Sequence, residues 1–286
     1  MSDLILTSSP HLHGTRTTRS IMLDVVIALF PTLVAATVLF GFRALLVTLV
    51  CVGTCVLSEF LFRKLLHRTT TVDDLSAVVT GMILAFNLPV TVPYWMAAFG
   101  SVVAILVVKE LFGGIGKNFA NPAATARIIL ALSFGAAVGR FVTPVNWVSL
   151  GSNAELVSSA TPLSGGELPS LLEMFLGLRA GCLGETCALT LLLGFVYLLI
   201  RKVITWQAPV CFVGGVFVLT ALAGLIPGVD ILPATYQVLS GGLLLGAVFM
   251  ATDYSTTPMT AWGKAIFGFG CALQFRFYPP SHESTL

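Results

Sequence analysis

Long apolar runs are the feature that most constrains this chain. They recur from residue 21 onward, and most have the roughly 17 to 25 residues that a helix needs to cross a bilayer. Of the 286 residues, 56% are hydrophobic and only 10% are charged, which is too little polar surface to coat a soluble globule. The weaker alternating segments of an outer-membrane barrel are not seen. The sequence therefore predicts an all-α polytopic membrane protein.

The apolar runs predict about nine transmembrane or re-entrant helices. The third is short and is stopped by Pro89, which favours a short or re-entrant helix buried among others. Similar basic helix ends, Phe62-Arg63-Lys64 and Ile200-Arg201-Lys202, suggest an internal duplication. The predicted helices cover residues 21–40, 44–62, 75–88, 94–112, 123–138, 183–200, 209–226, 236–252 and 265–277.

Five regions follow from this pattern. Residues 1–20 are a polar lead, 21–139 a first bundle half, 140–180 the longest polar interval, 181–277 a second half and 278–286 a polar tail. The net charge of +2 gives no electrostatic footprint for nucleic acid. The six cysteines show no metal-site spacing. We expect membrane lipid as the surroundings and no nucleic-acid partner.

Basic residues in the short loops predict the orientation. If the N-terminus is cytoplasmic and the segments alternate, most lysines and arginines fall on the cytoplasmic side, as the positive-inside rule requires. The polar interval 140–180 then lies on the extracytoplasmic side of a bacterial inner membrane. The cytoplasmic set is Arg16, Arg19, Arg63, Lys64, Arg68, Lys109, Lys117, Arg127, Arg201, Lys202 and Lys264, against Arg43, Arg140, Arg179 and Arg276.

The polar interval contains the run Ser158-Ser159-Ala160-Thr161-Pro162-Leu163. Taken alone, such a run favours a turn or a helix cap, because short hydroxyl side chains bond nearby backbone groups. It also resembles the flavin-attachment motif of a family that includes the D subunit of the Rnf electron-transport complex and the B subunit of the sodium-pumping NADH:quinone reductase. In that family the motif's threonine carries FMN through a phosphoester, which implies Thr161 here. Ser158 and Ser159 would neighbour the phosphate.

The resemblance extends along most of the chain and is closest to the Rnf member of the family. Two departures are visible: Ala120 separates Phe119 from Asn121, and the chain turns polar where the family normally continues into another helix. The matching runs, in the family's order, are Ser8-Ser9-Pro10-His11, Asp74-Leu75-Ser76-Ala77-Val78-Val79-Thr80-Gly81, Asn87-Leu88-Pro89, the loop from Lys109 to Ala123, Gly184-Glu185-Thr186, Leu239-Ser240-Gly241-Gly242 and Phe249-Met250-Ala251-Thr252-Asp253.

The resemblance implies a membrane subunit of an Rnf-type ferredoxin:NAD⁺ oxidoreductase, which moves electrons through covalent FMN while the complex transports Na⁺ or H⁺. Such a subunit belongs to a redox-driven translocase and completes no reaction alone, since it lacks an iron–sulfur motif and a nucleotide fingerprint. Its implied partners are the other Rnf subunits and an extracytoplasmic flavin transferase. The family also implies riboflavin, or a second non-covalent flavin, near residues 113–121. A plain surface turn explains those residues equally well.

Carboxylates in or beside apolar runs are candidates for an ion path, because ionisable groups are costly in a membrane. They are Asp24, Glu59, Glu185 and Asp253, with Glu110 as a further member. The ordinary alternative is pairing with neighbouring bases, as Glu59 near Arg63 and Glu110 beside Lys109 suggest.

Two other function classes stay open from the residues. A small-solute channel or secondary transporter would share broken helices and an internal duplication but carry no covalent flavin. A structural scaffold would tolerate loss of the Thr161 hydroxyl.

Overall fold

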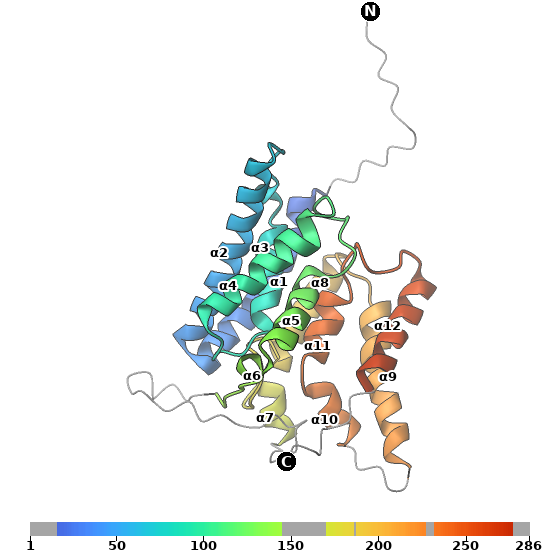
Figure 1. Ribbon diagram of the computed structural model, residues 1–286. Coiled ribbons are helices and arrows are strands. Elements are labelled where there is room, and N and C mark those ends of the chain that lie inside the picture. The colour runs from blue at the N-terminus through green and yellow to red at the C-terminus, as the bar shows by residue number, and fades with distance from the viewer. Residues whose placement is uncertain (1–15, 145–169, 186, 227–231, 277–286) are drawn as a thin grey trace, which may run out of the picture.

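The computed structural model describes residues 16–144, 170–185, 187–226 and 232–276, which form helices joined by turns (Figure 1). Three helices are long and apolar enough to cross a membrane: α1 (Thr18–Phe40), α2 (Phe42–Leu65) and α9 (Gln207–Gly224). Shorter apolar helices are α3 (Ser76–Phe86), α5 (Pro122–Ser133) and α8 (Ala188–Ile200). The predicted all-helical, polytopic architecture is confirmed.

Helix ends follow from local sequence. The Thr17 hydroxyl caps α1 by accepting a hydrogen bond from the Ser20 backbone N–H at 3.3 Å. Gly41, with a φ of 77°, turns the chain from α1 directly into α2, a conformation that glycine adopts without steric cost. The α5 helix begins at Asn121-Pro122, where the asparagine caps and the proline occupies the first turn.

The two predicted halves share one core. Helix α1 packs against α8, α2 against α3 and α4 (Tyr94–Val103), and α9 against α12 (Ala261–Arg276). The main cluster joins residues from both halves, including Leu29, Leu84, Phe86, Leu191 and Leu245. The chain therefore folds as a bundle in which residues 181–276 complete the core begun by residues 21–139.

Helix α3 is the short buried helix that Pro89 and the short apolar run predict. Ten of its eleven residues are buried. The chain after α3 is non-helical, so the carbonyl groups at the end of α3 and just beyond it need hydrogen-bond donors from elsewhere in the protein. Leu183 N–H donates to the Leu88 carbonyl at 3.0 Å and Gly184 N–H to the Phe86 carbonyl at 2.9 Å. Arg43 Nε donates to the Val90 carbonyl at 2.8 Å.

The same pairing corrects one predicted boundary. The helix expected from residue 183 begins only at Ala188, because residues 183 and 184 bond to the end of α3. The polar interval also holds a helix that hydropathy does not predict, α7 (Leu171–Leu176), which starts at a capping box formed by Ser170 and Glu173.

Three other predicted segments are interrupted. Residues 94–112 continue from α4 into a π-helix, η2 (Ala104–Glu110). Residues 123–138 break at Phe134, between α5 and α6 (Gly135–Val138). Residues 236–252 break at Gly241, where φ is 64°, into α10 (Ala234–Leu239), α11 (Leu243–Leu245) and the π-helix η5 (Gly246–Met250). Apolar runs do not reveal such breaks, because hydropathy does not depend on backbone geometry.

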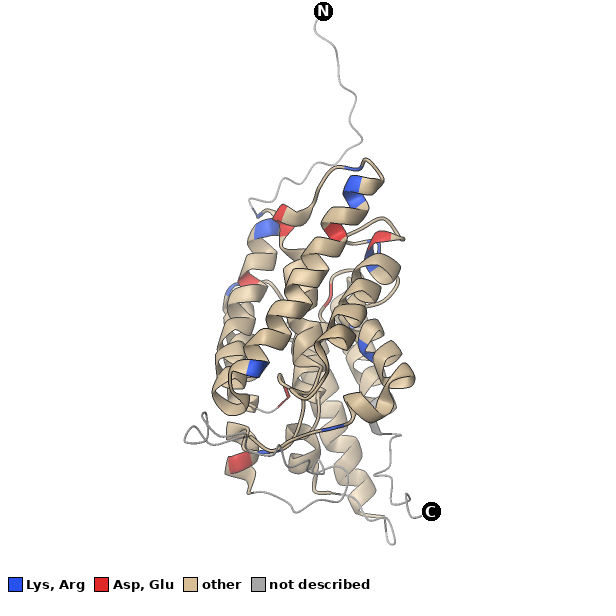
Figure 2. Cartoon of the chain, turned by 60° about the vertical axis from the view of Figure 1, so that its left-hand side comes forward, with Lys and Arg blue, Asp and Glu red and all other residues tan. Residues whose placement is uncertain are grey.

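Ser158, Ser159 and Thr161 lie outside the described residues. The described chain stops at residue 144, after α6, and resumes at residue 170, before α7. Helices α6 and α7 lie at the lower end of the bundle in Figure 1, opposite the turn between α2 and α3. Figure 2 shows more charged segments toward the upper end than toward the lower end.

Gly81 tests how closely α2 and α3 approach. A Cβ atom at residue 81 would lie 2.6 Å from the Val52 Cα atom, so backbone must move to accept it. We expect Gly81→Ala to destabilise the protein by about 1–3 kcal/mol through overpacking, measured as a lower Tm in detergent. Gly53→Ala on α2 is the matched control, because a Cβ there meets nothing within 4 Å. Equal Tm values for the two variants would contradict the close approach.

Candidate functional site

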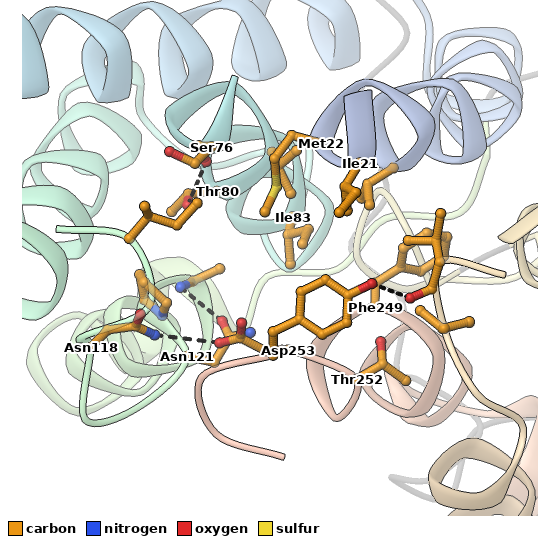
Figure 3. Close-up of a pocket in the computed structure, with 18 of the residues that line it drawn as sticks. Ile21, Met22, Ser76, Thr80, Ile83, Asn118, Asn121, Phe249, Thr252 and Asp253 are labelled. Atoms are coloured by element: carbon orange, nitrogen blue, oxygen red, sulfur yellow. Dashed lines mark hydrogen bonds between the residues drawn. The ribbon is translucent and has the colours of Figure 1, made fainter. Parts of the chain in front are cut away.

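A cavity of about 110 Å³ lies between the two halves (Figure 3). Its apolar wall comes from the start of α1, the end of α8 and η5. Its polar wall comes from α3, η2 and the segments before α5 and after η5. The lining residues include Ile21, Met22, Val25, Ser76, Thr80, Ile83, Lys109, Asn118, Asn121, Leu198, Val203, Val248, Phe249, Thr252, Asp253 and Tyr254.

Two asparagines and an aspartate form one polar edge of the cavity (Figure 3). Asn118 Nδ2 lies 3.4 Å from Asp253 Oδ2 and donates to the Ala120 carbonyl at 2.9 Å. Asn121 Oδ1 accepts from the Ala123 and Ala124 N–H groups at 3.0 and 3.1 Å. Ala120, the departure from the family pattern, thus supplies a carbonyl that orients Asn118.

Both π-helices of the described chain border this cavity. Lys109 comes from η2, and Val248 and Phe249 come from η5. Their wider turns are marked by hydrogen bonds over five residues, from Leu111 N–H to the Leu106 carbonyl and from Ala251 N–H to the Gly246 carbonyl. π-Helical turns occur frequently at functional sites. The backbone irregularities thus support a site here.

A buried ion pair joins the polar wall to α2, with Lys109 on the wall and Glu59 behind it. Lys109 Nζ lies 2.7 Å from Glu59 Oε2 on α2 and donates to Ser76 Oγ on α3 at 2.6 Å. The Lys109 side chain is 3% exposed and that of Glu59 0%. Thr71 donates to the other oxygen of Glu59. A buried charge is tolerated only with close partners and further hydrogen bonds, and both residues have them.

A second buried pair extends this network. Arg63 Nε lies 3.0 Å from Glu110 Oε2, its Nη2 donates to Glu110 Oε1 at 3.2 Å, and its Nη1 donates to the Thr69 carbonyl at 3.0 Å. The contact expected between Glu59 and Arg63 is present but long, at 3.9 Å. The expected pairing of Glu110 with Lys109 is wrong. These neighbours in sequence turn to different partners, 47 and 50 residues away.

The remaining candidate carboxylates are distributed over the molecule. Asp24 accepts from Tyr197 at 3.0 Å and pairs with Arg201 at 3.1 Å, joining α1 to the end of α8. Glu185 Oε2 lies 3.4 Å from the Cys182 N–H. Asp253 is part of the cavity wall, whereas Glu59 reaches it only through Lys109.

Sequence reasoning did not single out Lys109, Ser76 or Thr80 as site residues. A signal was present for Lys109, since a cation near the end of an apolar run is itself a candidate functional group. Ser76 and Thr80 lie one helical turn apart, and the Thr80 hydroxyl donates to the Ser76 carbonyl at 3.0 Å. Both belong to the largely apolar run of residues 75–88, where sequence alone favours a role in helix packing.

The sequence as a whole matches a known family. Residues 5–277 match the family described as NQR2, RnfD, RnfE. The chain belongs to this family. With three helices able to cross a membrane, it is an integral membrane protein. The resemblance inferred from the motifs is thereby confirmed.

Individual relatives in the family share much of the sequence. The chain is 43% identical over 280 residues to the D subunit of the Na⁺-translocating ferredoxin:NAD⁺ oxidoreductase complex of Acetobacterium woodii, covering 95% of this chain and 83% of the relative. It is 36% identical over 280 residues to the proton-translocating counterpart of Clostridium ljungdahlii, covering 93% and 83%. It is 31% identical over 318 residues to the D subunit of the ion-translocating oxidoreductase complex of Actinobacillus succinogenes, covering 96% and 90%.

Arg63 tests the energetic role of the buried pairs. Arg63→Gln leaves the Glu110 carboxylate, which is 0% exposed, without its cation. We expect a loss of about 3–5 kcal/mol, as for other broken buried pairs, measured as a lower Tm in detergent. The double variant Arg63→Met with Glu110→Met removes both charges and should recover most of the loss. If the single variant were as stable as the wild type, the pair would have no structural role.

Proposed function

We propose that this chain is the D-type membrane subunit of an Rnf-type complex, in a bacterial inner membrane, that passes electrons through bound flavin while the complex transports Na⁺ or H⁺. The observation that carries this proposal is the 43% identity over 95% of the chain to a protein named as the D subunit of such a complex. The chain would work as one subunit of a redox-driven translocase. Its partners would be the other Rnf subunits.

Thr161 is the proposed attachment point of FMN. A threonine hydroxyl can be esterified by the flavin phosphate, with an extracytoplasmic flavin transferase as the maturation partner. Pro162 favours an extended conformation for the residue before it, which would present the hydroxyl, and Ser158 and Ser159 would hydrogen-bond the phosphate. A flavin supplies the one- or two-electron chemistry, whereas the protein supplies position.

The described parts of the interval 140–180, which are residues 140–144 and 170–180, support its proposed extracytoplasmic placement. Helices α6 and α7, the nearest described helices before and after residues 145–169, lie at the end of the bundle opposite the α2–α3 turn (Figure 1). The end of α2 and that turn carry the basic group Arg63, Lys64 and Arg68, which the positive-inside rule assigns to the cytoplasm. The attached flavin would then face the opposite side.

The cavity is the proposed site of a second, non-covalent flavin such as riboflavin. Ligand sites combine apolar walls with a few polar groups, and this cavity has both. Ile21, Val25 and Phe249 offer apolar surface to a flat ring, and the Asn118 and Asn121 amides stand at its polar edge. Hydrogen bonds from these amides to backbone carbonyls hold the amides in place. Apolar surfaces with a polar edge fit a flavin ring, which is flat and carries carbonyl and nitrogen groups along its rim.

Asp253 is the strongest candidate for the ion path among the four carboxylates. Glu59 and Asp24 are already paired with Lys109 and Arg201, so an incoming cation would have to displace a base. Asp253 instead is bonded by the uncharged Asn118 and Ser255 and stands on the cavity wall. Glu185, the fourth candidate, lies beside the Cys182 backbone.

A solute transporter is the alternative that one observation favours. Helices that break beside an internal site are typical of secondary transporters, and the π-helix η5, which follows α11 and ends at the cavity, is such a break. Such a protein would carry no covalent flavin.

Covalent attachment is tested on a denaturing gel under ultraviolet light. After co-expression with the flavin transferase, we expect a fluorescent band for the wild type and a dark band for Thr161→Val, because valine has no hydroxyl to esterify. Ser164→Ala, a hydroxyl removed elsewhere in the same polar interval, should leave the band bright. A dark wild-type band, with the transferase shown to modify a known substrate, would favour the transporter.

The cavity assignment is tested by filling it. Val25→Phe adds bulk at the cavity wall, whereas Ile27→Phe adds the same kind of bulk at a site on α1 that is 45% exposed. We expect acid-extractable flavin in the purified complex to fall several-fold for Val25→Phe only, with the Thr161-dependent fluorescence unchanged in both. If Val25→Phe still yielded as much extractable flavin as the wild type, the non-covalent flavin would have to bind outside this cavity.

A further inference from the structure

We propose that Lys109 is the proton donor to the redox-active ring held in the cavity, and that Glu59 and Thr71 connect Lys109 to solvent at the end of the molecule bearing the α2–α3 turn. The proposal rests on the non-covalent flavin proposed for this cavity. It goes beyond that assignment by giving a reaction role to a buried lysine that holding the flavin does not require.

The position of Lys109 is the first argument. Its side chain is buried, yet it forms part of the cavity wall. An ammonium group has three N–H donors. One of them serves Glu59 Oε2 at 2.7 Å and one serves Ser76 Oγ at 2.6 Å. The third remains for a ligand on the cavity side, where an acceptor such as a ring nitrogen would be placed.

The path to solvent is the second argument. Glu59 uses one carboxylate oxygen for Lys109 and the other for the Thr71 hydroxyl. Thr71 is only partly buried and lies in the connection between α2 and α3, which is at the upper end of the bundle in Figure 1. Hydrogen bonds therefore run without interruption from this connection to the cavity wall.

The charged groups around Lys109 define its setting. Glu59 pairs with it from α2, and Arg63 lies 3.9 Å from the other oxygen of Glu59. Asp74 accepts a hydrogen bond from the Ser76 hydroxyl at 2.5 Å. Glu110 is taken up by Arg63. Glu59 is thus the only carboxylate bonded directly to Lys109 among the described residues. A proton that reaches the Glu59 carboxylate can pass to Lys109 through the 2.7 Å contact between Glu59 Oε2 and Lys109 Nζ.

The proposed step balances in charge and atoms. As two electrons enter the oxidised ring from a low-potential donor of the complex, the Lys109 ammonium gives one proton to a ring nitrogen and becomes a neutral amine. The reduced ring then carries one negative charge. Glu59 takes up a proton from solvent through Thr71 and passes it to the amine, which restores the ion pair. One proton is consumed from that side for every two electrons.

Lys109→Arg separates charge from proton donation. Arginine keeps the positive charge and the pairing with Glu59, but its guanidinium does not deprotonate in proteins. We expect acid-extractable flavin and Tm to stay at wild-type values, while the rate of flavin reduction by dithionite falls by roughly 100-fold, the scale of general acid catalysis. The wild-type rate should also be slower in D₂O, and this isotope effect should disappear in the variant.

Glu59→Gln and Lys64→Arg complete the experiment. Glu59→Gln keeps a hydrogen bond to Lys109 but cannot carry a proton as a carboxylic acid, so we expect slow reduction of the flavin that is retained. Its Tm should fall, because the buried Lys109 loses its counter-ion. Lys64→Arg makes the same substitution at an exposed lysine of α2 and should reduce at the wild-type rate.

Three results would overturn the proposal. Wild-type reduction rates in Lys109→Arg and Glu59→Gln, at full flavin content, would exclude the relay. Loss of flavin from both variants would make the pair a holding group rather than a proton path. Absence of extractable flavin from the wild type would remove the ligand from the cavity. The Thr161-dependent gel fluorescence, measured on the same samples, reports separately whether the covalent electron carrier survives.

Discussion

The contact between Lys109 Nζ and Glu59 Oε2, at 2.7 Å, is the interaction on which the rest of the site depends. Each charge alone would cost several kcal/mol to bury, so the intact pair stabilises the close packing of α2 and η2. Ser76 joins α3 to the same ammonium group, and Arg63 with Glu110 repeats the link one turn nearer the α2–α3 turn. Three elements are thereby fixed around one cavity wall.

Most of the polar groups of the cavity come from segments that depart from regular α-helical geometry. Asn118 and Asn121 precede α5, Thr252 and Asp253 follow η5, and η5 ends where Asn121 Nδ2 reaches the Met250 carbonyl at 3.4 Å. These irregular segments bring amides, hydroxyls and a carboxylate into an otherwise apolar bundle. Together with a flavin on Thr161 at the opposite end, the arrangement we propose would place redox groups toward both faces of the membrane.

More of the architecture than of the site could be predicted from the sequence. Long apolar runs were enough to predict a helical membrane protein, and Pro89 with a short run predicted the buried helix α3. Hydropathy could not predict the π-helices, the late start of α8 or the partner of Lys109, because these depend on residues far away in sequence. Glu59 and Lys109 are 50 residues apart, and only the packing of η2 on α2 brings them together. Thr161 was identified by a motif, and its role remains a prediction.

A structure of the assembled complex, at a resolution that shows side chains, tests the central claim most directly. That claim is that the cavity beside the Lys109–Glu59 pair holds a redox cofactor. We expect flat density of three fused rings between α1, α3, α5 and η5, with Lys109 Nζ within hydrogen-bonding distance of a ring nitrogen. A cavity containing only water or a lipid chain, in a complex that is active in electron transfer, would contradict it.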